Sequence, residues 1–132
     1  MNQRPRIRDY MASKVMTLSP DMEILRAMEL LLEMKFSGAP VVDESGRLVG
    51  VLSKKDCLKA ALNASYHQQW GGVIADYMST SVETLDANLD LVAAAERFLG
   101  SHYRRFPVME DGRMIGQISR ADLLRALVEC WR

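Results

Sequence analysis

Serine and aspartate recur in the same spacing at two places in the chain, in Gly50-Val-Leu-Ser-Lys-Lys-Asp56 and in Gly116-Gln-Ile-Ser-Arg-Ala-Asp122. In each segment an apolar stretch typical of a strand runs directly into residues typical of a helix, which places the serine at the helix start. Free backbone N–H groups there favour anions, and a serine hydroxyl can bind a phosphate or a ribose. The aspartate one turn later can accept two vicinal ribose hydroxyls, and the glycine leaves room for a flat ring beside the strand. The spacing therefore predicts two copies of one polar site.

The same spacing also has a purely structural interpretation. Ser-x-x-Asp is an aspartate version of the Ser-x-x-Glu capping box, which stabilises a helix by about 0.5–2 kcal/mol. One isolated copy would favour the capping interpretation, whereas two copies inside a repeat favour ligand contact by at least one of them. The two roles are compatible, because an empty site can use the carboxylate as a cap.

These segments belong to a longer internal repeat, in which Ile7–Leu18 returns as Ile74–Leu85. Each copy predicts an extended segment, a helix, two strands around a turn, and a closing helix. We expect the first helix of each copy to begin at Ser19-Pro20-Asp21 and near Asp86-Ala87-Asn88. The remaining elements are expected as strands at 39–42, 47–52, 106–109 and 113–118, and as closing helices from 54 to about 62 and from 120 to about 131.

The succession of elements predicts an α+β fold of two β-α-β-β-α repeats. Neither repeat would bury much of its sheet alone, so we expect the two to pack about a pseudo-twofold axis as one module. The repeats are expected at residues 7–62 and 73–132 within a single module of residues 1–132. A linker at 63–72 is expected because helical periodicity stops there and Gly71-Gly72 breaks the chain.

Composition narrows the class of protein. The 132 residues carry 17 Lys plus Arg and 17 Asp plus Glu, so the net charge gives no reason to expect nucleic acid or a membrane surface as partner. The two cysteines make no disulfide framework, no apolar run approaches the length of a membrane span, and no secretory signal is expected. We therefore expect a cytoplasmic protein. The two histidines and two cysteines show no metal-ligand spacing, so no metal is expected.

A family resemblance rests on five motifs that occur in order, twice. They are Asp-Tyr-Met, Val-x-Thr-Leu, a helix, a Pro-Val strand, and Gly-x-x-Ser-x-x-Asp. From about Ile7 to Leu127 the chain resembles the tandem cystathionine β-synthase (CBS) domain pair, or Bateman module. The resemblance implies a regulatory module that requires no cofactor, senses an adenosine-containing ligand (AMP, ADP, ATP or S-adenosylmethionine), forms a homodimer, and signals to an effector protein that the sequence does not identify.

The resemblance also implies two clefts, each shared between the repeats and each with adenine-side contacts made largely through the backbone. The first cleft would comprise Ser119, Arg120 and Asp122 with Thr17, Phe36, Ser37, Gly38 and Ala39. The second would comprise Ser53, Lys54 and Asp56 with Thr84, Tyr103, Arg104, Arg105 and Phe106. The candidates for the walls of a purine pocket are Val15, Ala39, Val51, Val82, Phe106 and Ile118, with ordinary core packing as the alternative role.

The two copies differ where a phosphate would lie. The second carries His102, Arg104, Arg105 and Arg120, where the first carries Lys35, Ser37, Gly38 and Lys54. Arginine suits phosphate oxygens geometrically. We therefore expect the Asp122 cleft to bind an adenine nucleotide more tightly than the Asp56 cleft, with a solvated loop as the alternative role of Arg104 and Arg105.

Three classes of function remain after these observations. The first is the ligand-sensing module, and the second is a structural or interaction module whose clefts have no physiological ligand. The third is an enzyme, which the sequence disfavours because it shows no nucleophile–base pair, metal triad or phosphate loop of the Gly-Lys-Ser type.

Overall fold

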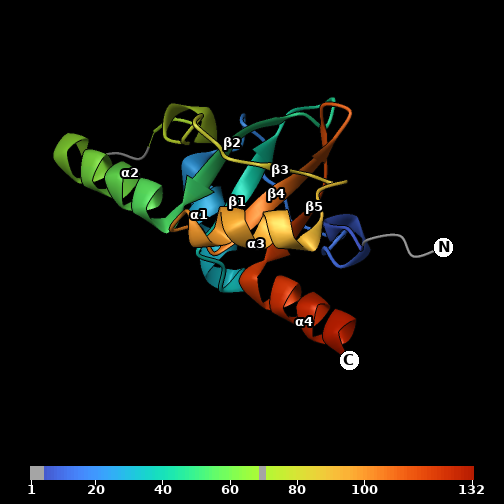
Figure 1. Cartoon of the computed structure of the whole chain (residues 1–132). Coiled ribbons are helices and arrows are strands. Elements are labelled where there is room, and N and C mark those ends of the chain that lie inside the picture. Colours follow the sequence, from blue (N-terminus) through green and yellow to red (C-terminus); the bar gives the residue numbers. More distant parts are fainter. Residues whose placement is uncertain (1–4, 69–70) are drawn as a thin grey trace. The chain divides into compact units, whose positions relative to one another are not determined.

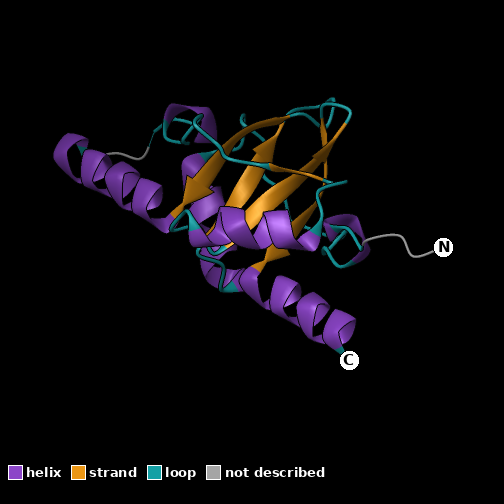
Figure 2. Ribbon diagram, in the orientation of Figure 1, coloured by secondary structure: helices purple, strands orange, loops and turns teal. Residues whose placement is uncertain are grey.

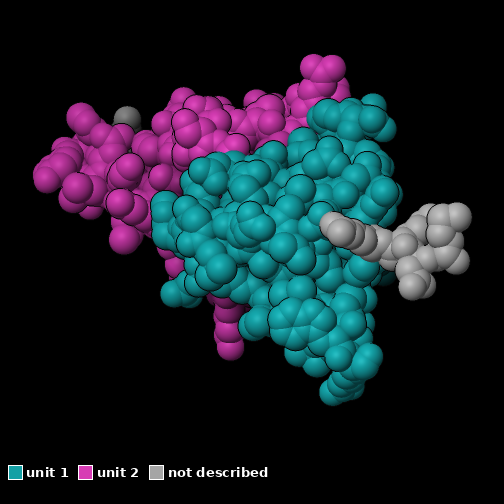
Figure 3. Space-filling view, viewed as in Figure 1, with its two compact units in different colours: residues 1–15, 83–132 teal, residues 16–82 magenta. Residues whose placement is uncertain are grey.

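The computed structural model describes residues 5–68 and 71–132 and has the α+β fold with two repeats of strands and helices (Figure 1, Figure 2). The described residues form two compact units (Figure 3). Unit 1 takes its residues from Met1–Val15 and Glu83–Arg132, and unit 2 from Met16–Val82. Each unit has its own hydrophobic core. Among the described residues, no helix combines the length and apolar character needed to cross a membrane.

Unit 2 is built on an antiparallel strand pair in which Gly38 lies opposite Ser53. Single residue pairs extend this sheet at both edges, because Leu18 bridges to Val41 in parallel and Ser79 bridges to Val51 in antiparallel orientation. Helix α1 turns its apolar face to the core. The elements are β1 (Gly38–Val42), β2 (Leu48–Ser53), α1 (Ile24–Met34), α2 (Lys54–His67) and the 3₁₀ helix η2 (Ile74–Asp76).

Unit 1 repeats this plan with a three-stranded sheet in the order β3-β4-β5. Strand β3 is parallel to β4, β4 is antiparallel to β5, and Ala12 extends the sheet by bridging to Gln117. Phe106 is fully buried at the centre of the core, where Phe98 packs edge-on against it with ring centroids 4.8 Å apart. The elements are η1 (Ile7–Asp9), β3 (Leu85–Asp86), α3 (Leu91–Leu99), β4 (Arg105–Glu110), β5 (Arg113–Ser119) and α4 (Arg120–Trp131).

The compact units exchange the segments that open the two sequence repeats. Ile7, at the start of the first repeat, lies in the core of unit 1 with Leu85 and Phe106. Ile74, at the start of the second repeat, lies in the core of unit 2 with Leu18 and Leu52. Each unit therefore combines one repeat's sheet with the Asp-Tyr-Met segment of the other repeat.

The two Asp-Tyr-Met segments are fixed in the same way. Asp9 and Asp76 cap their 3₁₀ helices, because their Oδ2 atoms accept from the backbone N–H of Arg6 (3.1 Å) and of Val73 (2.9 Å). Both aspartates therefore fix the start of a short helix in the same way. The next residues then pair with a sheet edge: Ala12 exchanges two backbone hydrogen bonds with Gln117 (2.8 and 2.9 Å).

Gly50 and Gly116 are glycines because these segments lie against them. A Cβ at Gly50 would lie 2.7 Å from Met78 Sδ and 2.8 Å from the carbonyl oxygen of Ser79. At Gly116 it would lie 2.6 Å from both Met11 Sδ and the carbonyl oxygen of Ala12. The expectation that these glycines leave room for a flat ring is therefore wrong, since a methionine and a backbone already fill the space.

Both expected starts of the first helices are wrong by several residues. Helix α1 begins at Ile24, because Glu23 is held in an extended conformation by its bridge to Val73, and Ser19 instead accepts from Met22 N–H within a turn. Helix α3 begins at Leu91, after the cap Asp90, whose Oδ1 accepts from Ala93 N–H at 2.8 Å.

Helix α2 is longer than the sequence predicts. It continues to His67 and ends at Gln68, whose left-handed conformation (φ 57°) closes the last turn. The first half of the expected linker 63–72 is therefore helical, and residues 69–70 of that linker lie outside the described residues. Ala64 continues the buried face that Cys57 and Ala60 begin, and it does so beyond Leu62, which explains the extension.

The close approach at Gly50 and Gly116 is testable. We expect Gly50→Ala and Gly116→Ala to lower the free energy of unfolding by about 1–3 kcal/mol, because the added methyl group displaces a backbone segment. Gly71→Ala is the control, since a Cβ there meets no atom within 4 Å. Urea unfolding of the three variants measures the effect, and equal stabilities would contradict the packing of the methionine segments.

Candidate functional site

The two Ser-x-x-Asp segments form reciprocal capping boxes at strand-to-helix junctions. Ser53 ends β2 directly before α2, and Ser119 ends β5 directly before α4. In both copies the aspartate backbone N–H donates to the serine Oγ at 3.1 Å, and the serine backbone N–H donates to the aspartate Oδ2 at 2.9 Å. The capping interpretation is thereby confirmed, and ligand contact by the same residues stays a prediction.

Beyond these shared bonds, the two carboxylates have different partners. Asp56 Oδ2 also accepts from the Ser53 hydroxyl at 2.9 Å. Asp122 Oδ1 instead forms an ion pair with Arg125 Nη2 at 2.6 Å. Arg125 is not among the residues expected from the sequence, although an acid and a base three residues apart on a helix indicate such a pair.

The start of one strand lies beside each capping box. Gly38 pairs with Ser53 in unit 2, and Arg105 pairs with Ser119 in unit 1. The loop before that strand is joined to the helix start, because Lys54 N–H donates to Ser37 O (2.9 Å) in unit 2. In unit 1, Arg120 N–H donates to the carbonyl of Arg104 (3.1 Å) in the same way.

Each unit thus brings together one complete half of the predicted residues. Unit 2 holds Thr17, Phe36, Ser37, Gly38 and Ala39 with Ser53, Lys54 and Asp56. Unit 1 holds Thr84, Tyr103, Arg104, Arg105 and Phe106 with Ser119, Arg120 and Asp122. The predicted clefts each pair a capping box of one unit with the strand segment of the other, and that pairing stays a prediction.

Of the six residues considered as purine walls, Ala39, Phe106 and Ile118 are core residues. Phe106 is fully buried and Ala39 is 3% exposed. Any contact of these positions with a ligand would therefore use backbone groups, since the side chains are already packed inside their units.

The basic residues of unit 1 differ in how far they are engaged. Arg120 Nε donates to the carbonyl of Tyr103 at 3.1 Å, which ties the 101–104 loop to the start of α4. The Tyr103 ring stacks on His102 with centroids 4.7 Å apart. Arg104 and Arg105 are exposed and form no ion pair with another described residue, so both guanidinium groups are available to an anion.

The buried Cys57 thiol and the metal-ligating residue types of the described chain add no chemistry to the site. Burial, together with the charge of Asp56, raises the pKa of the Cys57 thiol, which keeps it protonated and weakly nucleophilic. Within residues 5–68 and 71–132, no group of three or more His, Cys, Asp or Glu side chains could hold a metal ion.

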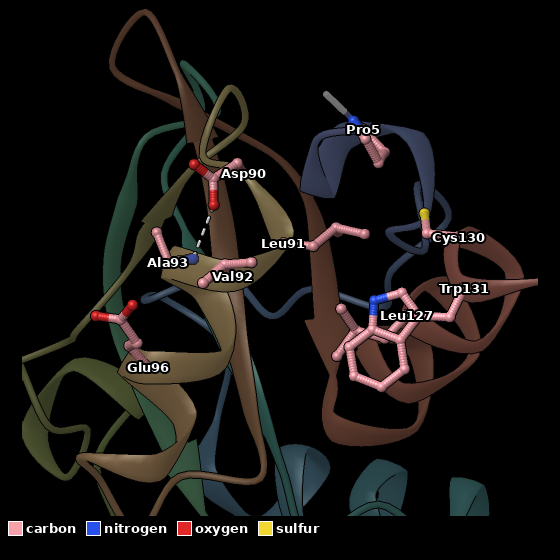
Figure 4. Close-up of a pocket in the computed structure, with 9 residues that line it drawn as sticks. All are labelled: Pro5, Asp90, Leu91, Val92, Ala93, Glu96, Leu127, Cys130 and Trp131. Atoms are coloured by element: carbon pink, nitrogen blue, oxygen red, sulfur yellow. Dashed lines mark hydrogen bonds between the residues drawn. The ribbon is translucent and has the colours of Figure 1, made fainter. Parts of the chain in front are cut away.

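A hollow of about 540 Å³ lies elsewhere in unit 1, between the first turn of α3 and the end of α4 (Figure 4). None of the predicted site residues lines it. Its lining residues are Pro5, Asp90, Leu91, Val92, Ala93, Glu96, Leu127, Cys130 and Trp131. A comparison of the two repeats in the sequence distinguishes this part of unit 1. The residues that match Leu127, Cys130 and Trp131 are the smaller Ala61, Ala64 and Ser65.

Sequence comparisons identify the repeated unit. The family model described as CBS domain matches twice, at residues 7–63 and 74–129. The chain is 27% identical over 161 residues to the CBS domain-containing protein CBSX1 of Arabidopsis thaliana, covering 97% of this chain and 68% of that protein. It is 28% identical over 125 residues to protein MJ1225 of Methanocaldococcus jannaschii, covering 95% of this chain and 44% of that protein, so it spans less than half of this relative.

Solved structures agree with this match. The crystal structure of CBSX2 from Arabidopsis thaliana in complex with AMP has a TM-score of 0.81 and 32% sequence identity, covering 96% of this chain and 98% of that one. The CBS domain pair of protein MJ0100, in complex with 5′-methylthioadenosine and S-adenosyl-L-methionine, has a TM-score of 0.73 at 22% identity and covers 97% and 99% of the two chains. At this identity it shows the shared fold alone.

The capping boxes can be tested without a ligand. We expect Ser53→Ala and Ser119→Ala each to lower the free energy of unfolding by about 1 kcal/mol, because the N–H of the following aspartate loses its acceptor. Ser65→Ala is the matched control, since its exposed hydroxyl donates to Ala61 O within the helix and caps nothing. Urea midpoints that do not separate Ser119→Ala from Ser65→Ala would contradict the capping role.

Proposed function

Because the chain belongs to the CBS-domain family, we propose that it is a regulatory module that binds an adenosine-containing ligand, with AMP as the first candidate. The observation that carries this proposal is the duplicated junction, where a strand ends at a capping serine and an aspartate follows one turn later. The CBSX2 complex supports AMP, because that protein matches nearly the whole chain at 32% identity. The proposed contacts are the two residue sets that the family resemblance implies.

The chemistry of the junction suits such a ligand. Ser53 and Ser119 lie at helix N-termini, where the helix dipole favours a phosphate. Asp56 and Asp122 are half-buried and fixed by their own caps, so little side-chain freedom is lost when a ribose binds. Binding rather than catalysis is proposed, because the carboxylates are held by backbone N–H groups and Cys57 is buried.

A thermal-shift panel tests the ligand class. AMP, ADP, ATP and S-adenosylmethionine are added in turn, and we expect at least one to raise the melting temperature, because binding to the folded state adds to its stability. Unchanged melting curves at about a thousandfold excess over a micromolar Kd would favour the alternative, an interaction module without a physiological ligand. Turnover of ATP above a buffer blank would instead indicate an enzyme.

One arginine at the junction supports unequal affinities of the two copies for AMP. Arg120 follows Ser119 at the start of α4 and belongs to the proposed cleft of Asp122, whereas unit 2 has Lys54 at the matching position. We propose that the cleft containing Asp122 binds AMP more tightly than the cleft containing Asp56.

Calorimetry with AMP on Asp122→Asn and Asp56→Asn tests this asymmetry. We expect each variant to lose its own site with at least about a tenfold drop in affinity, because a charged acceptor of ribose hydroxyls is replaced by a neutral amide. The tighter site should disappear in Asp122→Asn. Equal losses in the two variants, or none, would contradict the asymmetry.

We also propose that the protein is a cytoplasmic homodimer that signals occupancy to an effector protein. Four matched positions on the helices expose large apolar side chains in both repeats: Leu25 and Val92, Leu32 and Leu99, Leu58 and Leu124, and Leu62 and Val128. Leu58 and Leu124 are 70% and 64% exposed. The same exposed apolar positions therefore occur in both repeats, and a second copy of the chain is the simplest partner that would cover the two sets.

The dimer is tested with Leu58→Glu combined with Leu124→Glu. We expect the molar mass from light scattering to fall from two chains to one, because burying two added carboxylates in an apolar contact is unfavourable. Ser13→Glu combined with Thr80→Glu is the control, as these matched positions are exposed and lie outside the helices. A monomeric wild-type protein would contradict the homodimer.

A further inference from the structure

Arg125 holds the aspartate of only one of the two junctions. Its Nη2 lies 2.6 Å from Asp122 Oδ1, while Asp122 Oδ2 accepts from Ser119 N–H at 2.9 Å. The Asp122 side chain is 19% exposed and that of Arg125 is 58% exposed, so the ion pair lies at the surface over a half-buried carboxylate. Both carboxylate oxygens of this copy therefore already have a partner.

The matching position in the other repeat holds lysine. Lys59 follows Asp56 by three residues, as Arg125 follows Asp122. In the described part of the chain Asp56 has no ion-pair partner, and all of its side-chain hydrogen bonds come from Ser53 to Oδ2. Asp56 Oδ1 therefore has no partner among the described residues, in a junction whose backbone capping bonds are the same as those of the other copy.

A carboxylate that binds a ribose accepts one hydroxyl on each oxygen. In the Asp56 copy, Oδ1 can accept the first hydroxyl directly, and rotation of the Ser53 hydroxyl frees Oδ2 for the second. In the Asp122 copy, the guanidinium occupies the approach to Oδ1 with a charge-assisted hydrogen bond. Arginine forms such a directed bond to a carboxylate more readily than lysine, whose ammonium is strongly hydrated.

From this difference we propose that Arg125 is a positioning residue that lowers, without abolishing, the contribution of the ribose hydroxyls to binding at Asp122, so that the ribose contributes more at Asp56. The proposal rests on the proposed function, because it concerns how the same two aspartates bind an adenosine-containing ligand. It divides recognition between the repeats: the Asp122 copy gains more of its affinity through the phosphate beside Arg120, and the Asp56 copy gains more of it through the sugar.

The experiment compares AMP with 2′-deoxy-AMP at one site at a time. The ratio of their affinities measures the contribution of the 2′-hydroxyl, and the effect of Arg125 on the phosphate cancels because both ligands carry the same phosphate. Asp56→Asn isolates the Asp122 copy, and Asp122→Asn isolates the Asp56 copy. Calorimetry is run in both backgrounds, and the melting temperature of each variant verifies that it folds.

In the Asp56→Asn background, we expect Arg125→Gln to raise the AMP to 2′-deoxy-AMP ratio about two- to fivefold, the range of one surface ion pair. In the Asp122→Asn background, Lys59→Gln is the matched control and should leave the ratio unchanged. Lys59→Arg should lower it, because it installs the same ion pair on Asp56. Raising salt from about 0.05 to 0.5 M should raise the ratio only where the arginine is present, because salt screens the surface pair.

The outcomes separate the two proposals. If no variant and no wild-type protein binds AMP, the proposed function fails and this inference fails with it. If AMP binds but Arg125→Gln leaves the ratio unchanged or lowers it, the inference alone is overturned. A purely structural role of Arg125 would change the melting temperature without the salt-dependent change in the ratio.

Discussion

The closing of one sheet edge in each unit is the constraint on which the other features depend. Strands β2 and β5 would each leave an open edge, and unpaired edges are unstable and prone to aggregation. Ser79 and Ala12 cover them through paired backbone hydrogen bonds, and Met78 and Met11 lie on the bare faces of Gly50 and Gly116. Because the covering segment comes from the other repeat, neither sequence repeat completes a unit by itself, and the duplication is a structural requirement.

The same strands end at the capping serines, so the covered edge also fixes the junction. The direction of β5 is set by β4 and by the segment at Ala12, and α4 begins at the next residue. The aspartate is then held by the backbone of its own cap. A side chain that stabilises a helix start and is already ordered can also accept a ligand hydroxyl at little entropic cost, which is why capping and binding need not be alternatives.

Duplication kept the scaffold and let the chemistry diverge. Caps, strand register and four exposed apolar positions match between the repeats, whereas Arg125, Arg104 and Arg105 have no arginine counterparts. Trp131 is 82% exposed and lines the hollow of unit 1. The matching position in the first repeat is the much smaller Ser65. These arginine and tryptophan positions lie on the surface, where a substitution leaves the buried core intact.

The sequence by itself determined the repeated α+β plan, the two hairpins and the capping boxes, because each depends on residues within a few positions of one another. It misplaced the starts of α1 and α3 because Glu23 is held extended by distant Val73, and because Asp90 rather than Asp86 caps its helix. Only the tertiary structure decided that each Asp-Tyr-Met segment packs in the unit that contains the other repeat's sheet. It also decided that Gly50 and Gly116 lie against methionines and that the Phe106 side chain belongs to the core. These outcomes depend on contacts between residues far apart in the chain, about which local spacing carries no information.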